Sequence, residues 1–178
     1  MRKGNQQQQK FLQLYEPVHD PFERFCRARV FGKMEYQDLM NDTLLIAFQK
    51  MDTLKSEEAF LSFLIGISVR ILANNHKKKK EEAYPQELIF DVLDVNSKTE
   101  RDVEIFLLHK ALSTLPEAQR ECIILFEISG FSIKEIVALQ KISESAVKQR
   151  LKRGREKLTA ILTFDSSNKI EEVQNGTK

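Results

Sequence analysis

The sequence predicts an all-α fold, arranged as two small helical domains joined by an acidic linker, with a helix-turn-helix in the C-terminal domain. Apolar residues recur at spacings of three and four, whereas alternating apolar runs are scarce. The 178 residues include only six Gly and four Pro, too few for the many tight turns of sandwiches and barrels. A chain of this length forms one large domain or two small ones.

The N-terminal domain is predicted to span residues 8–80 as a small helical bundle. Seven of the twelve phenylalanines lie in this stretch. Apolar residues recur at near-helical spacing over 39–51, and a second helix is predicted over about 56–80, after a polar loop. The apolar stripe of that second helix comprises Phe60, Phe63, Leu64, Ile67 and Ile71.

A linker is predicted over 81–100. Residues 81–104 carry eight acidic and two basic side chains, a net charge of −6. This stretch also contains Pro85 and a polar run that leads into a helix at about Thr99. A solvated loop is the alternative interpretation, because most acidic stretches are solvated.

The C-terminal domain is predicted to span residues 101–163 and to be helical throughout. Thr114 and Glu117 match the start of a helix with a capping box, with Pro116 in its first turn. Gly130 is expected to end that helix, because glycine readily adopts the left-handed conformation. The polar residues 164–178 are predicted to form a flexible tail.

Two short helices joined by a tight turn are predicted over 132–158. Ser132 and Glu135 form a capping box that opens the first helix, and Ser143 caps the second. Ile142 is the apolar residue of the turn between them. The apolar stripe of the second helix is Val147, Leu151, Gly154, Leu158 and Ile161 or Leu162.

The opposite face of that second helix is polar and basic, as in a helix-turn-helix. Residues 132–158 hold eight basic and three acidic side chains, although the whole chain has a net charge of only +2. Such a face fits a major groove about 12 Å wide. A solvated amphipathic helix pair is the alternative. The face carries Lys148, Gln149, Lys152, Arg153 and Arg155 or Glu156.

A second basic feature is the run from His76 to Lys80, at the end of the predicted helix that carries Phe60 and Phe63. Aromatic rings beside lysines suit single-stranded nucleic acid, because bases stack on the rings while lysines hold phosphates. The alternative interpretation of the lysines is a solvated helix end, and a nuclear-import signal is a weaker one. The alternative interpretation of the phenylalanine rings is packing in the core.

Two blocks of the sequence, residues 36–80 (YQDLMNDTLLIAFQK and onward) and 111–158 (ALSTLPEAQRECIILFEISGFSIKEIVALQ and onward), resemble bacterial RNA polymerase sigma factors. The resemblance is to the small two-domain, extracytoplasmic-function type. It implies a subunit that binds core RNA polymerase and directs promoter-specific initiation. Core RNA polymerase and promoter DNA are the implied partners, an anti-sigma factor is a possible one, and no small-molecule substrate is expected.

The resemblance implies a base-capturing loop and three sets of site residues. The loop Asp52–Glu58 matches the loop that captures a flipped base of the minus-ten element. The polymerase-binding set is Asp38, Leu39, Asn41, Asp42 and Thr43. The minus-ten set is Phe60, Phe63, Arg70, Asn74, Asn75, Lys77 and Lys78. The minus-thirty-five set is Ser143, Ser145, Lys148, Gln149, Lys152 and Arg153.

The sequence departs from the family pattern at several of these positions. Phe63 replaces the usual Trp, and Lys141 replaces the usual turn Gly, so that turn has to tolerate a side chain. Asn41 and Asp42 are one methylene shorter than the usual Gln and Glu. Val69-Arg70 and Asn74 stand where Arg-Asn and a later Asp are usual.

No enzymatic activity, cofactor or metal site is expected. The sequence shows neither a nucleophile with its base nor a phosphate-binding loop, and His19, His76 and His109 are far apart along the chain. Cys26 and Cys122 are expected to be small core residues and not a disulfide framework. Without a signal peptide or an apolar run of about 18 residues, the expected location is cytoplasmic.

Two other classes of function remain open at this level. A dimeric helix-turn-helix regulator would bind duplex DNA without docking on polymerase, but it would have no use for the 38–43 block. A protein that binds an acidic protein partner through the basic helix would lack the steep salt dependence of nucleic-acid binding.

Overall fold

The computed structural model describes residues 2–81 and 99–175, and side chains within 5–75, at 99 and within 101–163. These residues fall into two compact units, one on each side of residues 89–90. Both units are helical, with no strand in the described ranges, which confirms the predicted all-α class. The exact domain limits of 8–80 and 101–163 stay a prediction.

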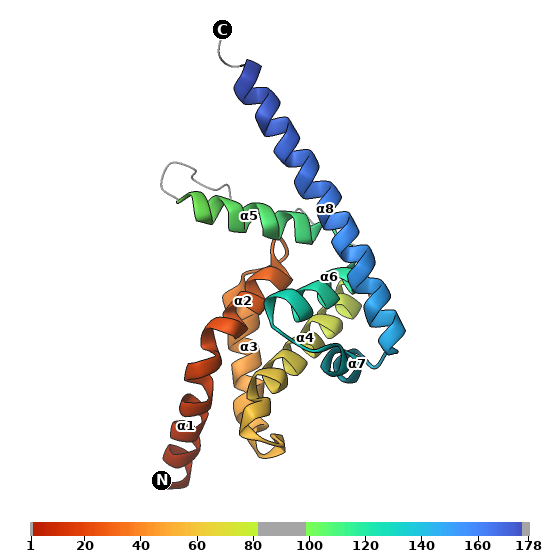
Figure 1. Cartoon of the computed structure of the whole chain (residues 1–178). Helices are drawn as coiled ribbons and strands as arrows, with labels where there is room; N and C mark the ends of the chain where they lie inside the picture. The colour runs from red at the N-terminus through yellow and green to blue at the C-terminus, as the bar shows by residue number, and fades with distance from the viewer. Residues whose placement is uncertain (1, 82–98, 176–178) are drawn as a thin grey trace. The chain divides into compact units, whose positions relative to one another are not determined.

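Within residues 2–81, the N-terminal unit contains four helices, drawn from red to yellow in Figure 1. Helix α1 begins ahead of residue 8, where the sequence places the start of the domain. Three short 3-10 turns, at Glu16–Val18, Met51–Thr53 and Glu57–Ala59, connect or precede helices. The helices are α1 (Arg2–Tyr15), α2 (His19–Val30), α3 (Tyr36–Gln49) and α4 (Phe60–Glu81).

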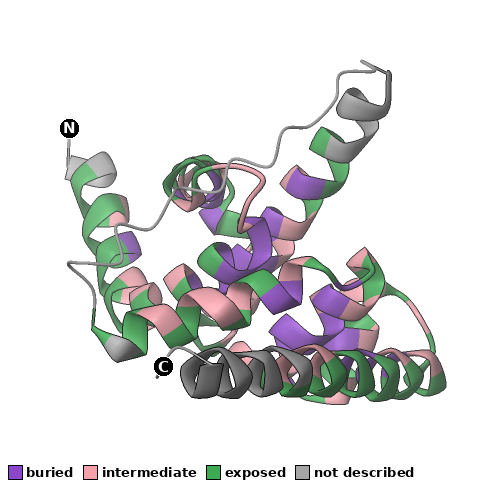
Figure 2. Ribbon diagram, turned by 90° about the horizontal axis from the view of Figure 1, so that it is seen from above, coloured by how far each residue is buried: buried purple, intermediate pink, exposed green. Residues whose placement is uncertain are grey.

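The core of this unit lies where α2, α3 and α4 face one another, and its fully buried side chains include Phe22, Phe25 and Leu64. Figure 2 shows buried segments on the facing sides of the helices. Inside this core, Ser68 Oγ donates to the Leu64 carbonyl at 3.0 Å and lies 2.9 Å from Thr43 Oγ1. Because the one hydroxyl proton of Ser68 is used, Thr43 is the donor to Ser68.

Helix α1 is held to the bundle through the ring of Phe11. That ring makes edge contacts with Phe48 of α3 and Phe60 of α4, both at centroid separations of 5.4 Å. Edge-to-face pairs of this kind stabilise beyond their buried area. The contacts fix the register of α1 against the 3-10 turns that precede α4.

Between residues 99 and 175, the C-terminal unit contains α5 (Glu100–Ser113), α6 (Glu117–Ile123), α7 (Ile133–Gln140) and α8 (Glu144–Asn175), with a π turn at Ile124–Ile128. Thr99 caps α5 in a capping box with Asp102, so the predicted helix entry is confirmed. Gly130 follows the π turn with φ of 73°, as expected for the residue that ends the helix. Cys122 and, in the other unit, Cys26 are buried and unbridged.

The predicted capping box at Thr114 is wrong. Thr114 is instead the C-cap residue that follows α5, and its hydroxyl donates to the Ala111 carbonyl at 2.7 Å. Pro116 occupies the N-cap of α6, and the Glu117 carboxylate pairs with Arg120. Helix α5 therefore extends far enough to use the hydroxyl that the sequence assigns to α6.

Two further predictions concern the acidic linker and the C-terminal tail. The acidic linker over 81–100 lies outside the described residues, apart from its ends. The backbone of α8 stays helical to Asn175, beyond residue 164 where the predicted flexible tail begins. The sequence has no Gly or Pro between Leu158 and Gly176 to end the helix.

Candidate nucleic-acid interface

The turn between α7 and α8 has the geometry of a helix-turn-helix. In the capping box of α7, the Ser132 hydroxyl donates to Glu135 Oε2 at 2.6 Å, and this bond lowers the pKa of the Glu135 carboxyl. Lys141 then takes the left-handed conformation, with φ of 55°, and ends α7. The Ser143 hydroxyl accepts from the Ala146 amide at 3.2 Å and caps α8. Both predicted caps and the strained turn residue are confirmed.

The inner face of α8 matches the predicted apolar stripe. Val147 and Leu151 are buried, and Leu158 is half-buried. Gly154 lets α8 approach α6 closely, because a Cβ at this position would lie 2.8 Å from Ile123 Cγ1. This packing fixes which face of α8 points outward.

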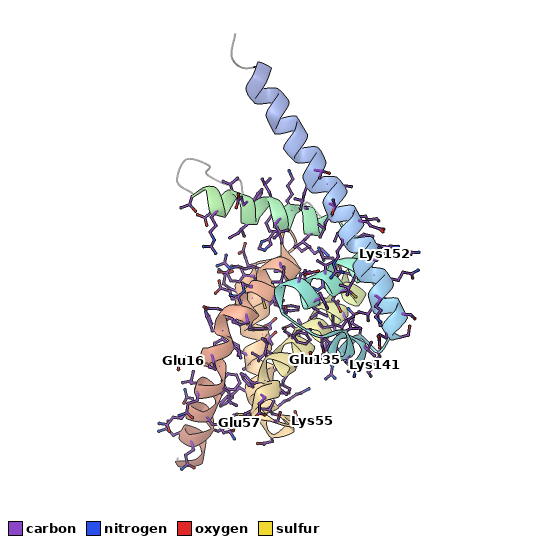
Figure 3. The ribbon with its side chains drawn as sticks, viewed as in Figure 1. Glu16, Lys55, Glu57, Glu135, Lys141 and Lys152 are labelled. Atoms are coloured by element: carbon purple, nitrogen blue, oxygen red, sulfur yellow. The ribbon has the colours of Figure 1, made fainter. Side chains whose placement is uncertain are left out.

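The outer face of α8 carries the predicted reading residues. Lys148 pairs with Glu144 at 2.6 Å and Lys152 with Glu156 at 3.9 Å, all on the same helix. Exposed ion pairs of this type contribute little to stability. Exchanging the glutamate partner of either lysine for a phosphate oxygen would therefore cost little free energy. Figure 3 shows Lys152 projecting from α8. The predicted residues Ser143, Ser145, Lys148, Gln149, Lys152 and Arg153 are all exposed.

Arg155 turns back toward its own unit instead of joining the outer face. Its guanidinium pairs with Glu127 at 2.7 Å and lies 5.3 Å from the centroid of the Phe126 ring. It therefore holds α8 to the π turn. The sequence left open whether Arg155 or Glu156 shares the outer face, and the structure favours Glu156 there.

A polar hub that the sequence did not reveal braces the helix-turn-helix. Gln140 Nε2 donates to Glu121 Oε1 at 2.7 Å, and Gln140 Oε1 accepts from Arg150 Nη1 at 3.2 Å. Cys122 Sγ lies 3.2 Å from the same oxygen, and burial raises the pKa of that thiol. One side chain of α7 thus ties α6 to α8. No periodicity signals it, because Gln140 and its partners are spread over three different helices.

The minus-ten set divides by burial in the structure. Phe60 is 1% exposed and packs against Phe11, so its ring is not available to stack on a base, and its predicted direct contact is corrected to a core role. Phe63 is half-buried. Arg70, Asn74 and Asn75 are exposed further along α4. The side chains of Lys77 and Lys78 lie outside the described residues.

The polymerase-binding set divides in the same way. Leu39 and Thr43 are fully buried, so both support the fold and neither can touch a partner directly. Asp38, Asn41 and Asp42 are exposed on the outer face of α3. Leu45, which the sequence did not single out, continues that face one turn later and is 60% exposed. Single exposed apolar side chains are common on protein surfaces, so a contact role for this face stays a prediction.

The loop that precedes α4 forms one side of an open groove against α1. Lys10 of α1 and Glu57 of the loop approach to 2.9 Å, and Figure 3 shows Glu57 on the side of the loop that faces α1. The groove has a volume of about 600 Å³. Its loop side lies within Asp52–Glu58, the segment matched to base capture.

One cluster of metal-ligand type occurs among the described residues. His19, Asp20 and Glu23 have ligand atoms within 4.8 Å of one another. However, His19 Nδ1 is bonded to the Tyr15 hydroxyl at 2.9 Å, and Glu23 pairs with Arg27 at 2.6 Å. His19 and Glu23 are therefore engaged with each other and with Tyr15 and Arg27, and we assign no metal to this cluster.

Comparison with known proteins identifies what these units are similar to. Residues 105–158 match the family model described as Sigma-70, region 4. The chain is 25% identical over 154 residues to the ECF RNA polymerase sigma factor SigM of Mycobacterium tuberculosis, covering 86% of this chain and 78% of SigM. It is 28% identical over 157 residues to the RNA polymerase sigma factor SigZ of Bacillus subtilis, covering 84% of this chain and 85% of SigZ.

Solved structures extend the likeness to both units. The sigma factor RpoE of Bartonella quintana, solved with the anti-sigma factor NepR, aligns with a TM-score of 0.71 and 25% identity, over 88% of this chain and 98% of RpoE. CnrH, solved with the cytosolic domain of CnrY, aligns in fold with a TM-score of 0.64 at 24% identity, over 89% of this chain and 90% of CnrH. None of the described helices combines the length and apolar character needed to cross a membrane.

Proposed function

We infer that this chain is an RNA polymerase sigma factor of the extracytoplasmic-function type, which binds core RNA polymerase and directs promoter-specific initiation. The observation that carries the conclusion is that one chain joins both units of its relatives, in the same order, over most of its length. A dimeric regulator would need only the helix-turn-helix. It would have no use for the exposed face of α3.

The C-terminal unit is assigned to the duplex minus-thirty-five element. Its outer face on α8 carries Lys148, Gln149, Lys152 and Arg153, with the apolar stripe behind them buried. Lysine and arginine pair with guanine edges and glutamine with adenine, and each good bidentate contact discriminates by about 1–3 kcal/mol. The exposed cations also hold phosphates and so make binding salt-dependent.

The N-terminal unit is assigned to the opened minus-ten strand. Unstacking a base costs a few kcal/mol, and stacking on protein returns about 1–3 kcal/mol per base. Opening is thus close to balanced, and a few contacts decide it. After correction for burial, the residues available for these contacts are Phe63, Arg70, Asn74 and Asn75, with Lys77 and Lys78 retained from the sequence.

Docking on core polymerase is assigned to the outer face of α3, made of Asp38, Asn41, Asp42 and Leu45. An anti-sigma factor is a further partner, supported by the relative RpoE, which was solved in complex with the anti-sigma factor NepR. We place the protein in the cytoplasm with the polymerase and assign it no reaction of its own, because its task is recognition.

The test uses the chain bound to core polymerase on a promoter that it transcribes. Lys148→Ala and Arg153→Ala are each expected to lower occupancy of the minus-thirty-five element and to reduce the salt slope of binding by about one. Lys110→Ala is the matched control, because this exposed lysine lies on α5 of the same unit, outside the helix-turn-helix. Unchanged footprints in both variants would refute the assigned face.

A further inference from the structure

We propose that the glutamines at the start of α1 form the second wall of a base-binding groove, and that Gln6 and Gln7 help to select the unstacked base. This rests on the proposed function, because it concerns the strand that the N-terminal unit holds. The domain predicted from the sequence starts at residue 8 and so leaves Gln6 and Gln7 out. The wall carries Gln6, Gln7 and Lys10, and faces Leu54, Lys55 and Glu57.

The position of this wall is fixed by contacts on the same helix. Gln7 lies one turn before Phe11, and residues four apart share a helix face. The Phe11 ring is buried against Phe48 and Phe60, so the face with Gln7 is turned toward the loop. The Lys10–Glu57 pair at 2.9 Å joins the two walls. Gln7 is half-buried there, and Gln6 is exposed at the rim.

The charge of the groove suits a base better than a phosphate. Its lining includes two cations, Lys10 and Lys55, and two carboxylates, Asp52 and Glu57. Lys10 and Glu57 neutralise each other through their contact. A phosphate would meet as much negative as positive charge, whereas a neutral base meets none that repels it.

The remaining lining supplies what the faces and edges of a base require. Leu54 supplies most of the apolar contact to a ring face, because Met51 also lines the groove but is only 8% exposed. A glutamine amide both donates and accepts, and it pairs in two-point fashion with adenine. The volume of about 600 Å³ is within the range of roughly 300–1,000 Å³ typical of small-ligand sites. The groove is therefore matched to a base with a donor beside an acceptor, as in adenine.

The experiment compares base preferences of the polymerase holoenzyme on a random promoter library. The double variant Gln6→Ala/Gln7→Ala is expected to lose about five- to tenfold of its preference at one position of the opened segment. Preferences in the upstream duplex element should not change. Gln8→Ala is the matched control, because Gln8 is the same residue type on the same turn but does not line the groove.

A second variant separates recognition from folding. Gln6→Glu/Gln7→Glu keeps side-chain length but removes the amide donor, so the preferred base at that position should change and initiation should persist. Base preferences identical to those of the wild type in both double variants would overturn the proposal, as would an equal loss in Gln8→Ala. If the wild-type chain itself supports no initiation, the proposed function fails, and the inference fails with it.

Discussion

Gly154→Ala tests the close contact between α8 and α6 that orients the recognition face. In an open helix this change would stabilise by about 0.8–1.0 kcal/mol through helix propensity. Here the new Cβ would lie 2.8 Å from Ile123 Cγ1 and 3.2 Å from Ile123 Cδ1. Two such contacts are shorter than van der Waals distance, so Ile123 has to move.

The size of the effect follows from how firmly Ile123 is held. Its side chain is 3% exposed, and β-branching restricts its first torsion angle. Overpacking of a filled core costs about 1–3 kcal/mol. Subtracting the propensity gain leaves an expected net loss of about 1 kcal/mol in the free energy of unfolding.

The assay is urea unfolding of the full chain, followed by circular dichroism because the sequence has no tryptophan. Amide hydrogen exchange in α6 and α8 then locates the loss. Ala160→Gly, on an exposed position of α8, measures the propensity term alone. In an Ile123→Ala background, which removes both contacting atoms, Gly154→Ala should become stabilising. Stabilisation by about 1 kcal/mol in the wild-type background would refute the close approach.

Three further changes test other local features, all by urea unfolding. Lys141→Gly should stabilise by about 1 kcal/mol, because Lys141 has a φ of 55°; a loss would show that the turn needs the side chain. Ser132→Ala should destabilise by about 1 kcal/mol at neutral pH. Hydrogen bonds from Ser132 lower the pKa of the Glu135 carboxyl. Their contribution to the free energy of unfolding is therefore present above the ordinary pKa of 4.5 and is lost as pH falls through the lowered pKa. An equal loss of stability in Ser132→Ala at pH 7 and at pH 3 would contradict this. Thr43→Val should cost about 0.5–1.5 kcal/mol through the bond to Ser68, and no change would mean that this bond contributes nothing net.

Features fixed by local chemistry could be predicted from the sequence. The stripe from Val147 to Leu158 follows from helical spacing, because one face of α8 has to be buried. Ser132 and Ser143 were identifiable as caps because a short hydroxyl side chain before a helix satisfies a free amide. The left-handed Lys141 was signalled only by the family resemblance, which places a glycine at this turn position.

Features fixed by distant contacts could not be predicted. Phe60 is on a helix with basic residues, and its ring is buried by packing between helices that includes Phe11, far earlier in the chain. Leu39 and Thr43 belong to a surface motif by sequence, but the packing of α3 on α4 turns both inward. The capping pattern at Thr114 failed because α5 competes for the same hydroxyl.

Initiation by core RNA polymerase on a random promoter library, with and without this chain, tests the central claim most directly. With the chain present, we expect initiation from promoters that share two short elements at a fixed spacing, one read as duplex and one as opened strand. If core polymerase initiates equally, and without shared elements, whether or not the chain is added, the assignment of this protein as a sigma factor is wrong.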